Sequence, residues 1–512
     1  MIPMGVSPTR VRGLDRLLRT AVEARPTAPA LITGPERVPV GYAELDTLVD
    51  DLAERLTSQG LRVGDLVALE AANNVEFVVG LLGASRAGLV VAPVDPAVAR
   101  EERTVRLDRL GARVLLTDHA PDRPHADCPA WRLTFAPGRT GLALDTPTPS
   151  RPSPALGPDL AADDALVMLT AGTTGRPKMA PWTHRSITAV LGEICACYEL
   201  TSDDATVAVM PFFHGHGLIA GLLAPLSVGG SVLLPAGGRF SAHTFWTDLA
   251  AAKATWFTAV PTIIEILLTR ADADRDPATD SATHLRFVRT CSAPLSPAGA
   301  KAFEQLVRAP VLAAYGMTET THQATSQPFA TSPGRPGSVG LPTGVELRIV
   351  DGEVWVKGPT VTRGYLGDAA ETAKSFTDGW YHTGDLGILD ADGRLTVTGR
   401  IKTLINRGGE KISPEHVEEI LDQDPAVAES VVLGAPDPTL GERVVALIVP
   451  RYSHHVDQID PTRILDACRD RLARYEIPEN ITFVERIPHT PKGAIDRTAA
   501  LAAYARTDSS TP

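Results

Sequence analysis

The sequence predicts an α/β protein with a large N-terminal domain of layered β-sheets and helices and a small α+β domain at the C-terminal end. Its 512 residues exceed what one hydrophobic core usually supports, so at least two domains are expected. Segments of helical and strand-like periodicity alternate through the first part of the chain. From about Ile401 this pattern restarts with a glycine-rich turn. We therefore place the two domains at residues 1–400 and 401–512.

The large domain is expected to contain short buried strands that alternate with helices. Helical spacing of apolar residues occurs in Leu14–Glu23, Tyr42–Gln59, Ile187–Tyr198 and Leu218–Leu226. Short apolar runs that predict strands occur at Val67–Leu69, Val90–Pro93, Val114–Thr117, Ala165–Leu169, Thr206–Val209, Val232–Leu234, Trp256–Ala259 and Phe287–Thr290. The segment Pro121–Pro158, rich in proline and aspartate, is expected to be mostly loop, and the charged segment Ala271–Thr283 an exposed connection.

A β-rich section begins near Gly337 and leads into the small domain. The turn Asp351-Gly352 separates two strand patterns, at Glu346–Val350 and Glu353–Lys357. The elements expected in the small domain are the helices Pro414–Gln423 and Pro461–Arg474 and the strands Glu429–Leu433 and Val444–Pro450. The tail Asp508–Pro512 is expected to be disordered.

Composition excludes several classes of protein. The formal net charge of −12 argues against broad binding to nucleic acid or to anionic membranes. No window approaches the ~18 uninterrupted apolar residues of a membrane span, and Met1–Thr20 lacks the apolar core of a signal peptide. Five cysteines without framework spacing indicate a reducing compartment, so a cytoplasmic location is expected. Cys195 and Cys197 are expected to be two buried thiols.

The segment Thr170–Lys178, which follows a predicted strand, combines glycines and threonines with one lysine. Glycine lets several backbone N–H groups point into one concavity, which suits an anion, and threonine hydroxyls add donors. Lys178 adds a mobile positive charge of the kind that binds phosphate oxygens. The Walker A pattern does not fit, because Pro177 and Met179 flank this lysine. An ordinary surface loop is the alternative interpretation.

This segment resembles the phosphate loop, commonly written SGTTGxPKG, of the adenylate-forming acyl-CoA synthetase family. Further motifs of that family occur in the expected order from Tyr42 to Arg497. The family makes acyl-AMP from a carboxylic acid and ATP and then passes the acyl group to a thiol. The resemblance implies a carboxylic acid or acyl-adenylate, ATP or AMP, coenzyme A and Mg²⁺ as ligands, and a small mobile α+β C-terminal domain that rotates after Arg400. The phosphate-loop residues that it implies are Thr170, Thr173, Thr174 and Lys178.

Three further motifs carry the implied adenosine site. Thr290–Leu295 looks like the loop that lies along the edge of adenine. Tyr315–Glu319 matches a motif whose tyrosine stacks on adenine, whose threonine bonds the α-phosphate and whose glutamate holds Mg²⁺, and an aromatic face and a carboxylate suit these ligands. Trp380–Gly387 is similar to a motif whose aspartate accepts hydrogen bonds from both ribose hydroxyls. The implied nucleotide-binding residues are Ser292, Ala293, Pro294, Tyr315, Gly316, Thr318, Asp385 and Arg400, with Glu319 as the metal ligand.

The segment Pro211–Gly217 matches the part of the family where an aromatic residue or a histidine, here His214, gates the acyl pocket. In an alternative interpretation, His214 and His216 are half of a metal site, but no third ligand of suitable spacing lies nearby in the sequence.

The resemblance also implies residues for thioester formation. Lys402 occupies the hinge position about which the small domain swings. Gly408 and Gly409 form a turn that lets pantetheine pass close to the backbone, because a β-carbon would block that approach. Arg86 corresponds to a position that contacts a phosphate of coenzyme A. Together with His214 and Thr318, the hinge lysine and the two glycines are the implied catalytic residues.

Among the subgroups of the family, the chain most resembles oxalyl-CoA synthetase-like ligases. The segments that carry this resemblance are His216–Gly221, Thr258–Ile263, Cys291–Pro297 and Arg335–Gly340. Similarity of scaffold does not identify the acid. The small, apolar segment Leu218–Leu226 permits a bulky hydrophobic acid as readily as a small one.

The chain departs from the family at its C-terminal motif, approximately Pro-Lys-Thr-x-x-Gly-Lys-Ile-x-Arg, whose second lysine drives adenylation. Alignment of Gly493 and Ile495 places Ala494 at that lysine. Loss of one such preorganised donor typically costs about 10²–10³-fold in rate. Lys492 is a poor substitute, because two positions along an extended chain displace the ammonium by about 6–7 Å. In the phosphate loop, Ala171 and Met179 replace a serine and a glycine.

The hypothesis is therefore a ligase that is impaired in adenylation and acts mainly in thioesterification of a preformed acyl-adenylate, which a separate adenylating enzyme could supply. Three alternatives stay open: a complete two-step synthetase with an engineered Lys-to-Ala change, an adenylation enzyme that loads a carrier protein, and a non-catalytic acyl-adenylate binder.

Overall fold

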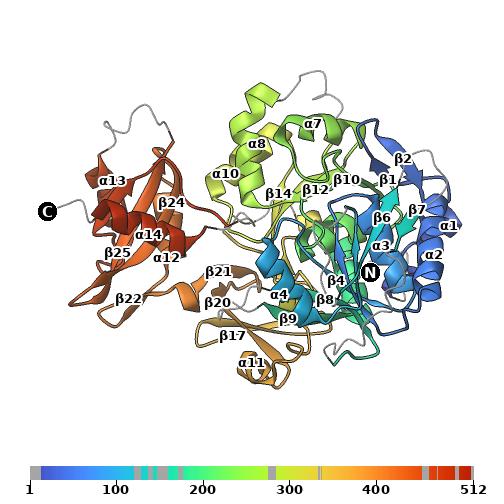
Figure 1. Cartoon of the computed structure of the whole chain (residues 1–512). Coiled ribbons are helices and arrows are strands. Elements are labelled where there is room, and N and C mark those ends of the chain that lie inside the picture. Colours follow the sequence, from blue (N-terminus) through green and yellow to red (C-terminus); the bar gives the residue numbers. More distant parts are fainter. Residues whose placement is uncertain are drawn as a thin grey trace.

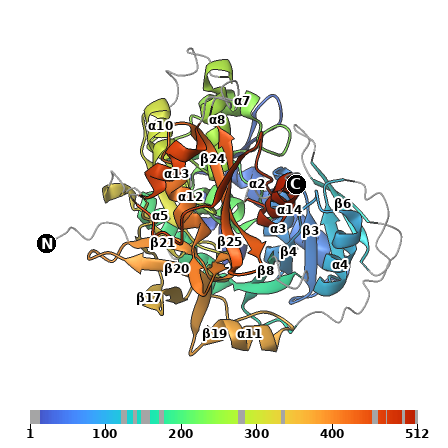
Figure 2. The same ribbon diagram turned by 90° about the vertical axis from the view of Figure 1, so that its left-hand side faces the viewer.

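The computed structural model describes residues 13–119, 128–135, 142–146, 159–170, 177–274, 284–331, 335, 337–451, 460–469, 471–490 and 495–508. Figure 1 shows a large body of helices around β-sheets and a smaller body at its left, formed by the C-terminal part of the chain. Seen from that side in Figure 2, strands β24 (Val427–Asp437) and β25 (Gly441–Pro450) of the smaller body lie in front of the larger one. The α/β class expected from the sequence is confirmed.

The largest sheet has seven strands in the order β7-β6-β5-β3-β4-β8-β9. The strands from β6 to β8 pair in parallel, and β7 and β9 add antiparallel edges. In chain order the strands are β3 (Leu66–Glu70), β4 (Val90–Pro93), β5 (Val114–Thr117), β6 (Ala130–Phe135), β7 (Leu142–Asp145), β8 (Asp164–Thr170) and β9 (Lys178–Thr183), and the helices are α2 (Tyr42–Ser58), α3 (Val75–Arg86) and α4 (Arg100–Leu110). Strands β3, β4 and β5 are buried and apolar except for Glu70 and Thr117 at the ends of β3 and β5, as is typical of parallel strands covered by helices.

Two further sheets complete the layers around this one, in the orders β10-β11-β1-β2 and β12-β13-β14-β15-β16. The strands are β1 (Pro29–Thr33), β2 (Val38–Gly41), β10 (Ala205–Val207), β11 (Ser231–Leu233), β12 (Trp256–Ala259), β13 (Phe287–Thr290), β14 (Val311–Tyr315), β15 (Thr325–Ser326) and β16 (Leu341–Pro342). The helices are η1 (Leu14–Arg16), α1 (Arg19–Ala24), α5 (His184–Tyr198), η2 (His216–Leu223), α6 (Ala224–Ser227), α7 (Ala242–Ala251), α8 (Pro261–Asp274), α10 (Pro297–Val307), η3 (Thr318–Thr320) and η4 (Phe329–Thr331).

The β-rich section expected near Gly337 forms a fourth sheet, in which β17, β18, β20 and β19 follow one another and β21 pairs with β20. Its elements are β17 (Glu346–Val350), β18 (Glu353–Lys357), α11 (Ala369–Ser375), β19 (Phe376–Thr377), β20 (Trp380–Leu389) and β21 (Leu395–Arg400). The turn at Asp351-Gly352 joins β17 and β18, as expected, with both residues at positive φ.

After η5 (Ile401–Thr403), the chain forms a sheet of its own, with β22, β23 and β26 beside the long β24–β25 hairpin. The remaining elements are β22 (Ile405–Arg407), β23 (Glu410–Ile412), α12 (Pro414–Leu421), α13 (Pro461–Arg469), β26 (Asn480–Phe483) and α14 (Arg497–Asp508). One face of the sheet packs with α12 and α13 and the other with α14, which gives two separate apolar clusters. The predicted domain boundary falls at the start of η5, and it stays a prediction.

The structure refines three expectations about local structure. Within Pro121–Pro158, the described residues include the two strands β6 and β7, which the composition of the segment did not indicate. α8 continues to Asp274, into the segment expected to be an exposed connection. Part of Leu218–Leu226 is a π-helix, in which Gly217 lies so close to the preceding chain that a β-carbon would be 2.2 Å from the carbonyl oxygen of Pro211.

The structure also bears on the predictions made for the cysteines and for membrane-spanning segments. All five cysteines are free thiols. Cys195 and Cys197 are each partly buried, and burial raises the pKa of Cys195 to about 11. No helix in the described part of the chain has the length and apolarity that a membrane crossing needs. The expected disordered tail lies outside the described residues, except for Asp508 at the end of α14.

Candidate active site

The structure brings together three of the predicted nucleotide-binding residues. Tyr315 ends β14, Asp385 lies in β20, and Arg400 ends β21 opposite Asp385. The hydroxyl of Tyr315 donates to Oδ2 of Asp385 at 2.6 Å, and Nε of Arg400 lies 2.7 Å from Oδ1. Burial raises the pKa of Asp385, and Arg400 and Tyr315 partly offset that effect. Each carboxylate oxygen can accept a further hydrogen bond, so the group fits the predicted binding of a diol.

Glu319, the predicted metal ligand, lies in η3 beside this group. It is buried, and Oε1 accepts a hydrogen bond of 2.7 Å from the hydroxyl of Tyr365. Burial raises the pKa of Glu319, while Tyr365 and Lys178 lower it. One carboxylate oxygen is therefore held by a phenol, and the carboxylate remains a suitable hard donor for Mg²⁺. No group of three or more histidine, cysteine, aspartate or glutamate side chains within the described residues could hold a metal ion, so the alternative of a metal site at His214 and His216 gains no support.

Lys178, the lysine of the predicted phosphate loop, begins β9 and pairs with Thr170 at the end of β8. Its ammonium forms an ion pair with Glu371 and lies 4.6 Å from the centre of the Tyr365 ring. The Asp368 side chain caps α11 by accepting from the backbone N–H of Glu371 at 3.0 Å, which places Glu371 in the first turn of that helix. Lys178 is the main cause that lowers the pKa of Glu371.

Of the predicted phosphate loop, the structure describes only the two ends. Ala171, Thr173 and Thr174 lie outside the described residues. Met179 stands where the family has a glycine, and its side chain is buried in an apolar cluster with Val167 and Leu366. The departure from glycine at this position is therefore accommodated in the core.

A second polar cluster surrounds His216, the first residue of the π-helix. Nε2 of His216 lies 2.6 Å from Oγ1 of Thr258, and Nδ1 lies 3.1 Å from Oγ of Ser292. The imidazole stacks on that of His322, with the ring centres 5.2 Å apart. The pKa values of both histidines are well below the usual range, because both are buried and face the cation of Arg289. The two rings are therefore neutral hydrogen-bonding groups near pH 7.

Arg289 lies in β13 and is completely buried. Its guanidinium donates to Oγ1 of Thr258 at 3.1 Å, to Nε2 of His322 at 2.9 Å, and also to Oε1 of Gln323 and to the hydroxyl of Tyr198. All four partners are neutral, and none of the contacts of Arg289 with the described residues is an ion pair. The cluster thus holds a buried positive charge that these side chains do not neutralise.

The contacts of Arg289 determine the tautomer of His322. Arginine has no acceptor, so Nε2 of His322 must accept, and the ring proton is on Nδ1. Among the described residues Nδ1 has no hydrogen-bond partner, which leaves it as a donor for a ligand.

Ser292 has a φ of 78°, in the region that favours glycine. A non-glycine residue in such a conformation costs on the order of 1 kcal/mol, so its hydroxyl beside His216 is retained at the expense of backbone strain.

Other predicted residues lie on the segments that join these clusters. The carbonyl oxygen of Thr318 accepts from Nε1 of Trp182 at 2.7 Å. A β-carbon on Gly316 would lie 1.9 Å from the carbonyl oxygen of His322, so only glycine fits there. The ring of His214 lies against that of Phe213 just before η2, with the ring centres 4.5 Å apart and the planes tilted by 60°. Ala293 and Pro294 follow β13 directly after Ser292.

The residues predicted for thioester formation lie mostly at the predicted hinge and in the smaller body. Lys402 lies in η5. Gly408 and Gly409 join β22 to β23, both with positive φ, and the N–H of Gly408 donates to Leu440 at 2.7 Å. Ala494 and Lys492 lie outside the described residues.

Arg86, predicted to bind coenzyme A, ends α3 in a structural contact. Its guanidinium forms ion pairs of 2.7 Å with Asp46 and with Asp50 of α2. These contacts join two helices, and a role in coenzyme A binding stays a prediction.

The sequence did not indicate Arg289, His322, Tyr365 or Glu371 as site residues. A signal for the first was present, because an arginine inside an apolar parallel-strand run is unusual. The other three contact site residues that are distant in sequence, which no local motif reveals.

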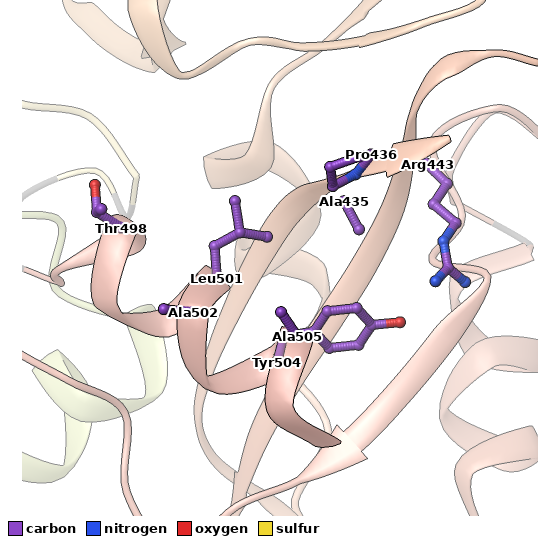
Figure 3. Close-up of a pocket in the computed structure, with 8 residues that line it drawn as sticks. All are labelled: Ala435, Pro436, Arg443, Thr498, Leu501, Ala502, Tyr504 and Ala505. Carbon is purple, nitrogen blue, oxygen red and sulfur yellow. The ribbon is translucent and has the colours of Figure 1, made fainter. Parts of the chain in front are cut away.

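The cavity shown in Figure 3 lies elsewhere, within the smaller body. It has a volume of about 540 Å³ and lies between α14 and the β24–β25 hairpin. Its lining residues are Ala435, Pro436, Arg443, Thr498, Leu501, Ala502, Tyr504 and Ala505. None of them is a predicted site residue, so the candidate site rests on the clusters around Asp385 and Arg289.

Comparison with known proteins now decides the family. The AMP-binding enzyme family matches residues 18–366, and the AMP-binding enzyme C-terminal domain matches residues 416–494. The chain belongs to the AMP-binding enzyme family. An oxalate–CoA ligase of Arabidopsis thaliana is 40% identical over 89% of this chain and 92% of the relative, and an oxalate–CoA ligase of Saccharomyces cerevisiae is 33% identical over 86% and 87%. The crystal structure of ATP-bound MatB from Rhodopseudomonas palustris superposes with a TM-score of 0.80 at 28% identity, over 96% of this chain and 99% of that one.

These findings confirm the resemblance to acyl-CoA ligases and the expectation of an enzyme. The protein is an acid–thiol ligase of the AMP-binding family, with a carboxylic acid and coenzyme A as substrates. The large N-terminal and small C-terminal domains of its structural relatives match the fold.

Proposed function

We propose that this AMP-binding enzyme forms the coenzyme A thioester of a short acid that carries a second anionic group, of which oxalate is the leading candidate. The observation that carries the proposal is the complete burial of Arg289 among neutral partners. A buried charge without a counter-ion is expensive, so a site that retains one favours an anionic ligand. Two relatives named as oxalate–CoA ligases support the same acid.

The groups around Arg289 suit the recognition of a carboxylate. His322 presents Nδ1–H, and Ser292 presents a hydroxyl at the entrance to the adenine-edge loop. Arg289 donates to Thr258 and to His322. Through these two contacts its charge polarises both histidines, although Arg289 does not contact the ligand itself. Neutral donors beside a buried cation would bind an anion. A fatty acid would offer these donors no acceptor.

At the nucleotide end, we infer that Asp385 accepts the ribose hydroxyls and that Tyr315 lies against adenine. The contacts of Asp385 with Tyr315 and Arg400 leave its carboxylate oxygens able to accept further hydrogen bonds. Glu319 would hold Mg²⁺, which neutralises phosphate charge when bound. Lys178 would bind the phosphates after it leaves Glu371.

A panel of acids tests the proposed substrate. The enzyme, coenzyme A, ATP and Mg²⁺ are incubated with oxalate, malonate, acetate or octanoate, and each thioester is quantified by mass spectrometry. Synthetic adenylates of the same acids form a parallel series. We expect at least about 100-fold more thioester from oxalate or its adenylate than from acetate. A ratio of this size corresponds to roughly 3 kcal/mol of binding energy from the recognition of the second charge. Equal use of octanoate would refute an anion-selective pocket.

We further propose that adenylation is weak and thioesterification is the main activity, with acyl-adenylate supplied in part by a separate adenylating enzyme. Ala494 at the position of the family's adenylation lysine supports this. Asp385, Lys402 and the glycine turn at Gly408, which serve the adenylate and the thiol, are all present. Met179 gives no support, because the core accommodates it.

Free acid with ATP and synthetic acyl-adenylate, each with coenzyme A, separate the two half-reactions. Product from the adenylate alone supports the proposal, and efficient product from free acid and ATP contradicts it. Ala494→Lys should raise the rate from free acid by about 10²-fold and leave the rate from the adenylate unchanged. A carrier protein supplied in place of coenzyme A tests the carrier-loading alternative, and binding of adenylate without turnover would indicate a non-catalytic binder.

A further inference from the structure

Tyr365 is a buried residue that contacts two of the predicted site residues at once. Its hydroxyl donates to Oε1 of Glu319 at 2.7 Å, and the ammonium of Lys178 lies over its ring, 4.6 Å from the ring centre. Glu319 and Lys178 are themselves close enough for the lysine to lower the pKa of the glutamate. The tyrosine therefore joins the predicted metal ligand to the predicted phosphate-binding cation.

The hydroxyl of Tyr365 orients one carboxylate oxygen of Glu319. Burial, together with the adjacent carboxylate, raises the pKa of the tyrosine above its ordinary value, so the phenol keeps its proton at neutral pH and donates it. An ionised carboxylate has two oxygens, and both only accept. The hydrogen bond at Oε1 thus fixes the direction of the group, while Oε2 can still face a cation.

The segment that carries Tyr365 is attached to the elements of both partners. Before the tyrosine, the N–H of Thr362 donates to the carbonyl oxygen of Glu319 in η3 at 2.8 Å. After it, the N–H of Leu366 donates at 2.9 Å to the carbonyl oxygen of Met179 in β9, the strand that begins with the phosphate-binding lysine. Backbone hydrogen bonds therefore hold the tyrosine between η3 and β9.

The tyrosine is also fixed against α11 and β19. Its N–H donates to Oγ1 of Thr372 in α11 at 2.9 Å, and its ring packs edge-on against that of Phe376, with the ring centres 6.2 Å apart. Gly364, just before it, has a φ of 135°, and a β-carbon there would lie 2.4 Å from Cγ2 of Thr372. Only glycine allows this approach, so the position of the tyrosine is set by the fold before any ligand binds.

We propose that Tyr365 is a positioning residue that fixes the carboxylate of Glu319 and the ammonium of Lys178 relative to each other. The hydroxyl acts through Glu319 on the metal ion, and the ring acts through Lys178 on the phosphates. When a phosphate takes the place of Glu371, the ring keeps its contact with the ammonium. This role rests on the proposed assignment of Glu319 to Mg²⁺ and of Lys178 to phosphate.

Two substitutions separate the hydroxyl from the ring. Tyr365→Phe removes only the hydroxyl, whereas Tyr365→Leu removes the hydroxyl and the aromatic face. Tyr504→Phe is the matched control, because it removes a buried phenol hydroxyl that has no hydrogen-bond partner among the described residues and lies in the smaller body. Calorimetric titration with ATP, without acid or coenzyme A, gives one Kd in excess Mg²⁺ and one in EDTA. The ratio of the two Kd values measures how much the metal ion strengthens ATP binding.

The ratio should be the same in the wild-type protein and in Tyr504→Phe. Tyr365→Phe should lower it about tenfold, as is typical when the partner of a metal ligand is lost, and should change the Kd in EDTA by less than about twofold. Tyr365→Leu should lower the ratio equally and also weaken binding in EDTA about three- to fivefold, because the contact between ring and ammonium is lost. An unchanged ratio in Tyr365→Phe, or unchanged binding by Tyr365→Leu in EDTA, would overturn the proposal.

Two further variants separate a failure of this role from a failure of the proposed function. Glu319→Gln should lower the ratio at least as much as Tyr365→Phe, and Lys178→Met should weaken binding in EDTA. If Mg²⁺ does not strengthen ATP binding to the wild-type protein, or if these two variants bind as the wild type does, the assignments of Glu319 and Lys178 are wrong. If they respond and the Tyr365 variants do not, only the positioning role is refuted. Thermal denaturation checks folding, and if Tyr365→Leu does not fold, Tyr365→Phe decides alone.

Discussion

Two cations of the candidate site, Arg289 and Lys178, are compensated in opposite ways. Arg289 is completely buried, and the groups that accept its hydrogen bonds are all neutral. Lys178 is also largely buried, but its ammonium already faces the carboxylate of Glu371. Arg289 therefore has no anionic partner among these groups, whereas Lys178 has one.

This difference indicates two modes of anion binding. If the proposed acid site is correct, an anion near Arg289 would add a counter-charge where the described residues supply none, and charge there would decide which acid is bound. A phosphate at Lys178 would replace Glu371, so the net gain in affinity would be smaller and the exchange reversible. Four substitutions test the contrast, taken from the largest expected effect to the smallest.

Arg289→Leu should abolish the preference for a doubly anionic acid. We expect kcat/KM for oxalate, or for its adenylate, to fall by at least about 100-fold, because the buried counter-charge is lost. The value for propionate should change far less. Kinetics with both acids on one preparation check this, and a parallel loss for both acids would show that Arg289 only maintains the fold. Retention of the tertiary structure is verified by thermal denaturation.

Lys178→Met should affect only the step that uses the outer phosphates. We expect the ATP-dependent rate to fall by about 10- to 100-fold, because one preorganised donor to phosphate is removed. Thioester formation from synthetic acyl-adenylate should change by less than about twofold, because that substrate lacks the outer phosphates. Similar losses in the two assays would contradict the assignment of Lys178 to phosphate binding.

Glu371→Gln should strengthen the binding of pyrophosphate by about five- to tenfold, because the phosphate no longer displaces a carboxylate from Lys178. The pKa of Glu371 is lowered in the folded protein, so the ion pair is present at neutral pH and is lost only as the pH falls through that lowered value. The advantage of the variant should therefore shrink at acid pH. Calorimetric titration with pyrophosphate measures both effects, with the exposed Glu410→Gln as control; weaker binding in Glu371→Gln would reverse the argument.

Ser292→Gly should change stability and activity in opposite directions. Glycine removes the strain at a φ of 78° and should stabilise the protein by about 0.5–1 kcal/mol. The lost hydroxyl should lower kcat/KM for the anionic acid about three- to fivefold. Thermal denaturation and steady-state kinetics on the same sample check the pair of effects. An unchanged kcat/KM would show that the hydroxyl of Ser292 does not contribute to acid binding.

The nucleotide end could be predicted well from the sequence. Tyr315, Asp385 and Arg400 each lie at a recognisable motif that ends or follows a strand, and the structure brings the three together. Their roles toward the nucleotide stay predictions, because the geometry agrees with them without testing them. Contiguous motifs of this kind survive in the sequence because neighbouring residues share one task.

The acid end could not be predicted from the sequence. Arg289 lies in a run that predicts an apolar strand, and its partners come from segments 31 to 91 residues away along the chain. The Lys178–Glu371 pair joins residues 193 apart. The strands in Pro121–Pro158 were missed for a related reason, since pairing with β5 overrides a composition typical of loops.

By itself, the sequence determined the α/β class, the family and the order of the motifs along the chain, because periodicity and local residue patterns encode these properties. The tertiary structure alone decided which charges are matched. A charge costs or gains free energy according to its burial and its distance from other charges, and both quantities are set only when distant strands and helices come together.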